Sequence, residues 1–172
     1  MGKVSKVFSV LAIIATIVFG AWTTVRIVKY VQFDFNCTQY IKRAADANTV
    51  ELAKEELEKV ISYAEENNLT KGTVSVFFHQ PKNDVGYWYS NLTESYAELE
   101  KLPEDASSLE KTNVLMKLRE TLTDENETGV VGTIPDGISI YPNNILYFWW
   151  GILSFIFSLL FWVMTYVFRY WN

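Results

Sequence analysis

The chain has 172 residues, enough for one domain with membrane anchors, and its formal net charge is −5. Residues 32–144 hold 10 Lys and Arg against all 20 Asp and Glu, and the remaining basic residues flank two apolar stretches near the ends. Such an acidic centre argues against nucleic acid as a partner, because phosphate contacts need clustered Lys and Arg. The single cysteine, Cys37, excludes an intramolecular disulfide and a zinc site built on several thiolates, and we interpret it as a small, half-buried residue.

Two uncharged apolar stretches, residues 7–25 and 145–168, predict membrane-spanning helices. About 20 helical residues cross a hydrocarbon core of about 30 Å, and backbone groups in lipid must pair within their own segment. The expected fold is a mainly α membrane protein, in which two transmembrane helices flank a helical bundle with a minor short β element. Its parts are a basic tail at 1–6, transmembrane helix 1 at 7–29, an acidic extramembrane domain at 30–144, transmembrane helix 2 at 145–168 and a C-terminal tail at 169–172.

The first apolar stretch has two interpretations. Lys3 and Lys6, followed by apolar residues and then Gly20-Ala21, are typical of a cleaved secretory signal peptide. The stretch is long for a signal peptide, however, and its cleavage site is poor. We therefore expect an uncleaved signal anchor.

The flanking basic residues give conflicting indications of orientation. Lys3, Lys6 and Arg169 favour cytoplasmic termini, whereas Arg26 and Lys29 favour the opposite. Because a basic N-terminus usually dominates, we expect both termini in the cytoplasm and residues 30–144 outside it, in a bacterial inner or plasma membrane. The Asn-x-Thr matches would be glycosylation acceptors in a eukaryotic secretory pathway and would mean nothing in a bacterium.

Apolar periodicity predicts three or four helices in the central region. Cys37, Tyr40, Ile41 and Ala44 recur at helical spacing in continuation of the first span, and three separate helices follow. The first begins after a cap at Asn48 or Thr49 and ends near residues 66–68. The second runs from about residue 84 to Leu102, before Pro103, and the third runs from a cap at Ser107 or Ser108 to about Leu122. The charged residues of the first helix read as a solvated face: Lys54, Glu55, Glu56, Glu58 and Lys59.

The minor β element is expected in two places. Thr73–Phe78 is β-branched and aromatic with partial alternation, which predicts a short strand. Residues 129–141 predict two further short strands around Pro135-Asp136-Gly137, a turn tripeptide. These segments could share one small sheet.

Three groups of residues are candidates for contacts. Small residues at four-residue spacing let helices approach closely in lipid, either within the chain or with another chain: Ala12, Thr16, Gly20, Gly151, Ser154 and Ser158. Rings with a polar edge prefer the headgroup level, which predicts interfacial anchors: Trp149, Trp150, Trp162, Tyr166, Tyr170 and Trp171. The densest aromatic cluster between the spans is a candidate interaction surface, or else a core or a membrane-facing ledge: Phe77, Phe78, His79, Tyr87, Trp88 and Tyr89.

No catalytic, cofactor or metal site is expected. His79, the only histidine, reads as a solvated loop residue, and there is no glycine-rich phosphate loop or nucleophile elbow. The apolar stretches 7–25 and 145–168 hold no Asp, Glu, Lys, Arg or His, which disfavours transport. The leading hypothesis is a non-enzymatic interaction, scaffold or accessory-subunit module, with the lipid bilayer and a second copy or another membrane protein as partners.

A sensor or ligand-binding domain is the alternative hypothesis. Two spans around a helical bundle resemble, in architecture, the input half of bacterial chemoreceptors. That resemblance implies ligand binding outside the membrane and a signal passed to a partner protein. The sequence does not identify a small-molecule ligand.

Overall fold

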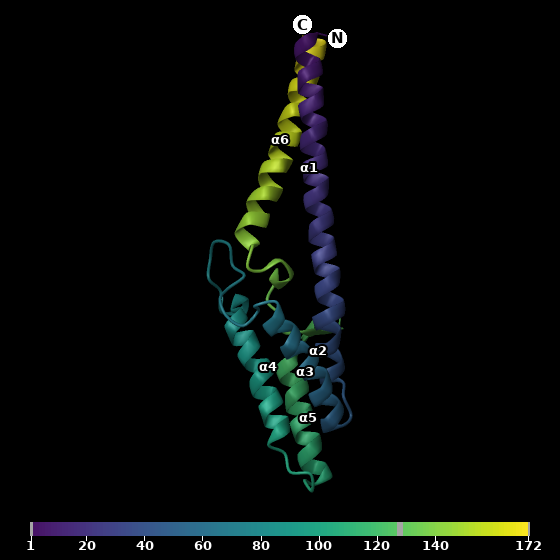
Figure 1. Ribbon diagram of the computed structural model, residues 1–172, viewed down its shortest axis with the longest axis vertical. Helices are drawn as coiled ribbons and strands as arrows, with labels where there is room; N and C mark the ends of the chain where they lie inside the picture. Colours follow the sequence, from purple (N-terminus) through teal and green to yellow (C-terminus); the bar gives the residue numbers. More distant parts are fainter. Residues whose placement is uncertain (1, 127–128, 172) are drawn as a thin grey trace. The chain divides into compact units, whose positions relative to one another are not determined.

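The computed structural model describes residues 2–126 and 129–171 and is mainly helical. The chain forms two compact units. The first combines the described residues up to Tyr30 with those from Asn143 onward, and the second comprises Val31–Pro142. The ribbon in Figure 1 is coloured along the chain, so each unit can be followed separately.

The first unit is an antiparallel pair formed by α6 (Asn144–Tyr170) and by α1 (Lys3–Phe33) up to Tyr30. Ring stacking joins Phe8 to Phe168 at one end of the pair, and Phe19 lies against Phe155 further along. At about 1.5 Å per residue the helices are about 46 and 40 Å long. Both are long and apolar enough to cross a membrane.

The second unit is built mainly from helices (Figure 1). α1 leads into the π-helical turn η1 (Asp34–Thr38) and then into α2 (Gln39–Ala45). The remaining helices are α3 (Val50–Glu66), η2 (Pro81–Asn83), α4 (Val85–Glu100), α5 (Ser108–Leu122) and η3 (Ile138–Ile140).

Side-chain caps set the starts of the three long helices in this unit. The hydroxyl of Thr49 accepts a bond from the Leu52 N–H at the start of α3. The carboxylate of Asp84 accepts from the Tyr87 N–H at the start of α4. Ser107 and Glu110 form a reciprocal capping box at the start of α5. The predicted helices are confirmed in these places.

The core of the second unit lies between α2, α3, α4 and α5. The apolar stripe of α3 is fully buried there: Ala53, Leu57, Val60 and Ala64. Leu92 and Leu99 of α4 and Leu118 and Leu122 of α5 pack into the same cluster. Cys37 is 0% exposed and is therefore fully buried, rather than half-buried as the sequence analysis expected.

The β structure differs from the sequence-based expectation. β1 (Thr123–Asn126) pairs antiparallel with β2 (Gly129–Gly132), Thr123 opposite Gly132. The predicted strand at Thr73–Phe78 is absent: an isolated bridge from Thr73 to Asp84 stands there instead. Of the two strands predicted around Pro135, the first is present as β2 but pairs with β1, and the second is absent because Gly137 takes a φ of 86° and starts the 3₁₀ turn η3.

Candidate functional site

Polar side chains connect the two long apolar helices. Thr16 Oγ1 of α1 lies 2.9 Å from Ser158 Oγ of α6. The indole of Trp162, expected to be an interfacial anchor, donates to Thr16 Oγ1 at 3.2 Å. The indole of Trp22 donates to the Tyr147 carbonyl at 2.7 Å. These groups therefore join the helices in the middle of their contact, at Thr16, and near one of its ends, at Trp22.

The small residues predicted to line a helix contact do not all lie in it. Ala12, Gly151 and Ser154 are buried. A Cβ added at Gly151 would lie 2.5 Å from Cζ2 of Trp22, so the indole needs a glycine there. Gly20 is exposed, and a Cβ there would meet no described atom within 4 Å.

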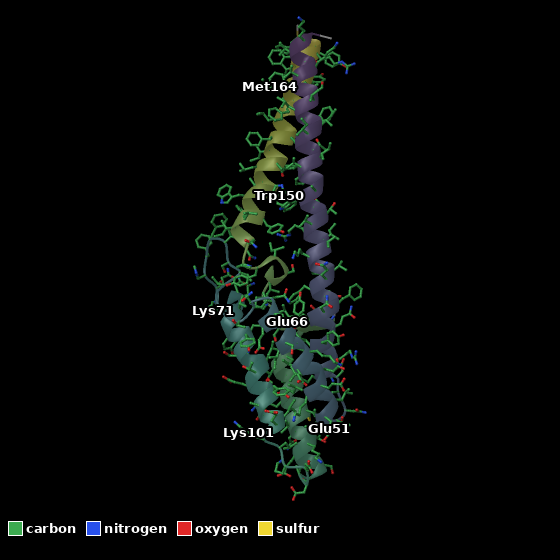
Figure 2. The ribbon with its side chains drawn as sticks, in the orientation of Figure 1. Glu51, Glu66, Lys71, Lys101, Trp150 and Met164 are labelled. Carbon is green, nitrogen blue, oxygen red and sulfur yellow. The ribbon has the colours of Figure 1, made fainter. Side chains whose placement is uncertain are left out.

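The other predicted anchors lie on the outer surface of the helix pair. Trp150 is half-buried, and the remaining four are largely exposed: Trp149, Tyr166, Tyr170 and Trp171. Figure 2 shows that the labelled Trp150 and Met164 lie on a helix whose side chains are mostly carbon, whereas oxygen and nitrogen tips are abundant around Glu51, Glu66 and Lys101. The apolar and charged residues are thus separated between the two units.

The predicted aromatic surface is split by the structure. Trp88 is buried in the core at 4% exposure, and Tyr89 is half-buried with its hydroxyl donating to Glu65 at 2.6 Å. Phe77, Phe78 and His79 are exposed on the loop between α3 and α4, and Tyr87 is exposed on the first turn of α4. These six residues therefore do not form one surface.

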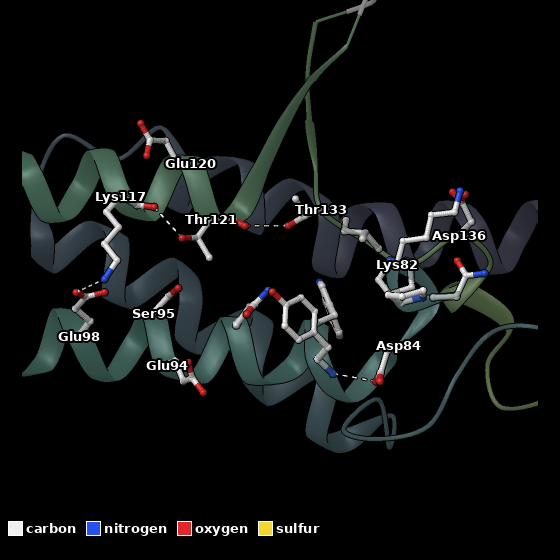
Figure 3. A pocket seen from close by; sticks show the side chains of 17 residues that line it. Lys82, Asp84, Glu94, Ser95, Glu98, Lys117, Glu120, Thr121, Thr133 and Asp136 are labelled. Carbon is white, nitrogen blue, oxygen red and sulfur yellow. Dashed lines mark hydrogen bonds and ion pairs between the residues drawn. The ribbon is translucent and has the colours of Figure 1, made fainter. Parts of the chain in front are cut away.

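A cleft of about 1030 Å³ lies between α4 and α5 in the second unit (Figure 3). One wall is a face of α4 with residues at helical spacing: Asn91, Glu94, Ser95 and Glu98. The opposite wall comes from Lys117, Glu120 and Thr121 of α5, and residues 133–136 and 81–84 complete the lining. Trp88 and Tyr87 of the predicted surface also line this cleft.

Backbone-directed bonds hold the loop of the cleft against α5. The Thr133 N–H donates to the Leu122 carbonyl at 2.9 Å, and the Thr133 hydroxyl donates to the Thr121 carbonyl at 3.1 Å. Across the cleft, Lys117 Nζ lies 2.6 Å from Glu98 Oε1 and so joins α5 to α4 (Figure 3). The cleft therefore has walls fixed by hydrogen bonds and an ion pair.

The charge in the cleft is mainly negative. Two lysines line it, Lys82 and Lys117, against five carboxylates: Asp84, Glu94, Glu98, Glu120 and Asp136. Lys117 is already paired with Glu98. Glu94 and Glu120 are exposed on opposite walls. The negative charge of this lining is thus suited to a cationic group.

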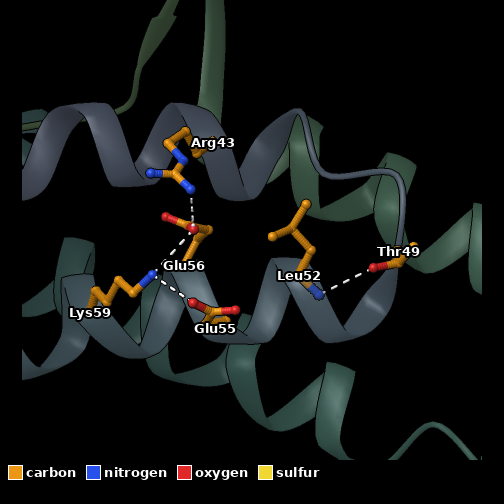
Figure 4. A network of polar contacts seen from close by, with 6 residues as sticks. All are labelled: Arg43, Thr49, Leu52, Glu55, Glu56 and Lys59. Atoms are coloured by element: carbon orange, nitrogen blue, oxygen red, sulfur yellow. Dashed lines mark hydrogen bonds and ion pairs between the residues drawn. The ribbon is translucent and has the colours of Figure 1, made fainter.

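A second polar cluster lies between α2 and α3 (Figure 4). The side chain of Glu56 is 1% exposed, so its expected place on a solvated face is wrong. Glu56 lies three residues after Ala53 and four before Val60, and this spacing places it on the buried stripe. Its Oε1 accepts from Arg43 at 2.7 Å and from Lys59 at 3.3 Å.

Lys59 also contacts Glu55 at 2.8 Å, so one lysine serves two carboxylates. Its hydrogen bond and charge lower the pKa of Glu55, and the Glu55 bond in turn raises the pKa of Lys59. Oε2 of Glu56 is buried without a hydrogen-bond partner among the described residues. This cluster fixes the contact between α2 and α3.

Sequence reasoning missed the cleft and the Glu56 cluster for different reasons. The cleft residues lie on polar faces of two separate helices, and no local sequence pattern predicts that these faces lie opposite each other. The position of Glu56 within the apolar stripe was a usable signal. Within the described part of the chain, no three His, Cys, Asp or Glu side chains converge to hold a metal ion.

Comparisons with known proteins add no functional information. No family model, no curated protein and no solved structure matches this chain.

Proposed function

We propose that this chain is a two-pass integral membrane protein whose 31–142 unit is a non-enzymatic interaction module. The observation that carries the membrane part is the exposure of large apolar side chains along α1 and α6, such as Ile17 at 65% and Leu159 at 58%. Removing apolar surface from water is worth about 25 cal/mol per Å². Lipid around the helix pair would supply that gain.

The proposed topology follows from the flanking charges and from the helix lengths. α1 and α6 span the bilayer, the termini lie in the cytoplasm, and the acidic unit lies outside it. Alkaline carbonate extraction of native membranes tests the anchoring. We expect the full chain in the pellet, and recovery in the supernatant would contradict it.

The interaction part of the proposal assigns the α4–α5 cleft to a basic segment of a partner protein. Its volume of about 1030 Å³ lies at the upper end of the range of about 300–1,000 Å³ for small-molecule sites, so it has room for a peptide side chain and its neighbours. Five carboxylates line it against two lysines. Tyr87, 66% exposed, supplies an aromatic contact of the kind enriched at binding hot spots.

Site-specific photo-crosslinking in native membranes tests this assignment. A benzophenone amino acid in place of Tyr87 should give a crosslink to a Lys- or Arg-rich peptide, identified by mass spectrometry. The same probe in place of Leu109, which is 70% exposed and outside the cleft, is the control. Equal crosslinking from both positions would contradict a specific site.

Charge reversal separates the cleft from the general acidity of the unit. Glu94→Lys with Glu120→Lys should abolish the Tyr87 crosslink, because both carboxylates line the cleft. Glu58→Lys with Glu104→Lys changes the net charge equally at exposed positions outside the cleft and should preserve the crosslink. Loss in both double variants would indicate long-range attraction only.

A sensor function is the second candidate, and the buried indole of Trp88 in the lining of the same cleft favours it. An aromatic wall with convergent polar groups is typical of small-molecule sites. A thermal-shift screen of the full chain in detergent with cationic metabolites tests it. A ligand that raises Tm in the parent chain and has no effect in the Glu94→Lys, Glu120→Lys variant would support this reading.

A further inference from the structure

The loop between α3 and α4 has a hydrogen-bonded neck. The Val74 N–H donates to the Asn83 carbonyl at 3.1 Å, and the Val85 N–H donates to the Gly72 carbonyl at 2.8 Å. The Thr73 hydroxyl also donates to the Asn83 carbonyl at 3.0 Å. Val74 is 4% exposed and belongs to the core, so the neck is fixed to the helical unit.

The neck presents residues 76–82, which we name the tip. Phe77 and Phe78 in the tip are 60% and 81% exposed. Phe77, Phe78 and His79 do not line the α4–α5 cleft. Exposure of Phe78, the more exposed of the two, leaves a large apolar surface in water, which is unfavourable.

Charge around the tip differs from the rest of the unit. Residues 67–83 contain no Asp or Glu and form the longest such stretch between residues 31 and 142, although the region as a whole is strongly acidic. The charged side chains of the stretch are the exposed Lys71 and Lys82, with His79 beside Phe78. An aromatic tip flanked by lysines matches an anionic membrane surface, which would repel the other faces of the unit.

The base of the loop is bound to the segment that leads into α6. The Tyr141 hydroxyl donates to the Lys71 carbonyl at 2.7 Å. Gly72 has a φ of 96°, and a Cβ there would collide with that hydroxyl. Tyr141 precedes by three residues the start of α6 at Asn144. The base of the loop is therefore bonded to a residue that precedes α6 by three positions in the chain.

We infer that the 76–82 tip inserts Phe77 and Phe78 into the headgroup region of the bilayer, with Lys71 and Lys82 contacting anionic lipids. This inference rests on the proposed membrane anchoring by α1 and α6. Anchoring supplies the high local concentration of lipid that two phenylalanines alone would not provide. The tip is then a third contact of the protein with the membrane, beside its two helices.

Fluorescence of single labels in the reconstituted full chain tests the inference. Phe78→Cys is labelled with an environment-sensitive nitrobenzoxadiazole probe in vesicles of phosphatidylcholine and phosphatidylglycerol. Leu109→Cys, at the opposite end of α4 and α5, is the matched exposed control, and Phe157→Cys reports on α6. Cys37 is buried, so the parent chain treated in parallel gives the background.

We expect the probe at residue 78 to emit at shorter wavelength than the probe at residue 109. Quenching by iodide should be several-fold weaker at 78, and lipids carrying a shallow doxyl group should quench it. Iodide quenching equal to that at residue 109 would overturn the inference, as would protection from iodide without lipid quenching, which indicates a protein contact.

The α6 probe separates two kinds of failure. Residue 157 lies at the centre of α6 and is therefore tested with lipids whose doxyl group is deep in the acyl chain. Deep quenching at 157 without shallow quenching at 78 leaves the anchoring intact and refutes the tip contact alone, whereas absence of deep quenching at 157 refutes the anchoring itself. Lys71→Glu with Lys82→Glu should weaken the lipid quenching at residue 78 and leave that at residue 157 unchanged.

Discussion

Glu56 places a carboxylate among the apolar side chains of α3, and one of its two oxygens is paired from a neighbouring helix. Arg43 approaches from α2 at 2.7 Å with its own side chain 60% exposed. The guanidinium of Arg43 is thus exposed to water, whereas the carboxylate of Glu56 is not. This asymmetry makes the pair sensitive to loss of the arginine, because the remaining charge would be buried with Lys59 alone.

Arg43→Ala should therefore destabilise the protein by about 2 kcal/mol, since it removes the closest partner of a buried carboxylate. Thermal unfolding of the full chain in detergent, followed by circular dichroism, measures the effect. Lys117→Ala is the control, because its ion pair with Glu98 is exposed on both sides and is worth at most about 1 kcal/mol. Equal losses in the two variants would show that burial of Glu56 has no energetic weight.

Glu56 also shows that residue type alone does not predict whether a side chain is buried. Glu55, Glu56 and Glu58 look alike as charged residues, and only the helical position of Glu56 distinguishes it. Trp88 and Tyr87 give a parallel case: they are adjacent aromatics about 100° apart around the helix, and Trp88 is buried whereas Tyr87 is exposed. Side-chain direction in a helix, rather than composition, decided each of these outcomes.

At the scale of elements, helices could be predicted from local patterns and strands could not. Thr49 and Ser107 cap helices where the sequence indicated, because a cap and an apolar stripe are both local signals. Thr73–Phe78 alternates like a strand, but the hydroxyl of Thr73 bonds to the Ser75 N–H and bends the backbone. A strand also needs a partner, which local sequence does not supply.

The capping box of α5 gives a prediction with a defined pH dependence. Bonds from the Ser107 hydroxyl and N–H lower the pKa of the Glu110 carboxyl below its ordinary value of 4.5. A depressed pKa means that the carboxylate stabilises the fold above pH 4.5 and loses that effect as the pH falls through the folded-state value. Glu110→Ala should lower Tm at pH 7 and lose this difference in acid.

Ser107→Ala is the control for the pH dependence of the capping box. The hydroxyl of Ser107 also accepts from the Glu110 N–H, and this bond does not require a charge. Its loss should lower Tm at both pH values. A Glu110→Ala deficit that is independent of pH would contradict the ionic contribution.

Close packing of α1 against α6 depends on Gly151. Gly151→Ala should separate the helices locally, because the added Cβ would lie 2.5 Å from Cζ2 of Trp22. Cysteines introduced at Thr16 and Ser158, whose hydroxyl oxygens are 2.9 Å apart, report on the contact through the yield of oxidative crosslinking. We expect a lower yield with Gly151→Ala and an unchanged yield with Gly20→Ala, where the Cβ meets open space. Equal crosslinking yields in the Gly151→Ala and Gly20→Ala variants would show that close packing does not depend on Gly151.

At the scale of the molecule, the sequence predicts the separation of apolar ends from an acidic centre, and the two compact units follow the same division. The α4–α5 cleft could not be predicted. Its lining depends on the angle at which two helices pack and on residues 133–136, which have no regular secondary structure. Both depend on contacts between residues far apart in sequence.

If α1 and α6 both cross the membrane, the two termini lie on the same side of it, whichever orientation the protein takes. Epitope tags at the two ends should have the same accessibility to protease in sealed membrane vesicles, and a maleimide label at Leu109→Cys should have the opposite accessibility. We expect the tags protected and residue 109 labelled when vesicles have their native outward orientation. Tags on opposite sides would mean that one of the apolar helices does not cross.

The pairing of Arg43 with Glu56 also gives a means of recognising distant relatives of the chain. A buried Glu56 carboxylate without the Arg43 guanidinium destabilises the fold. Homologues in which one of these two residues is replaced should therefore soon acquire a replacement of the other. In homologous chains, positions 43 and 56 are expected to vary jointly, with an apolar pair as the usual replacement. Such covariation, thirteen positions apart across a helical hairpin, would identify relatives in which little else of the sequence persists.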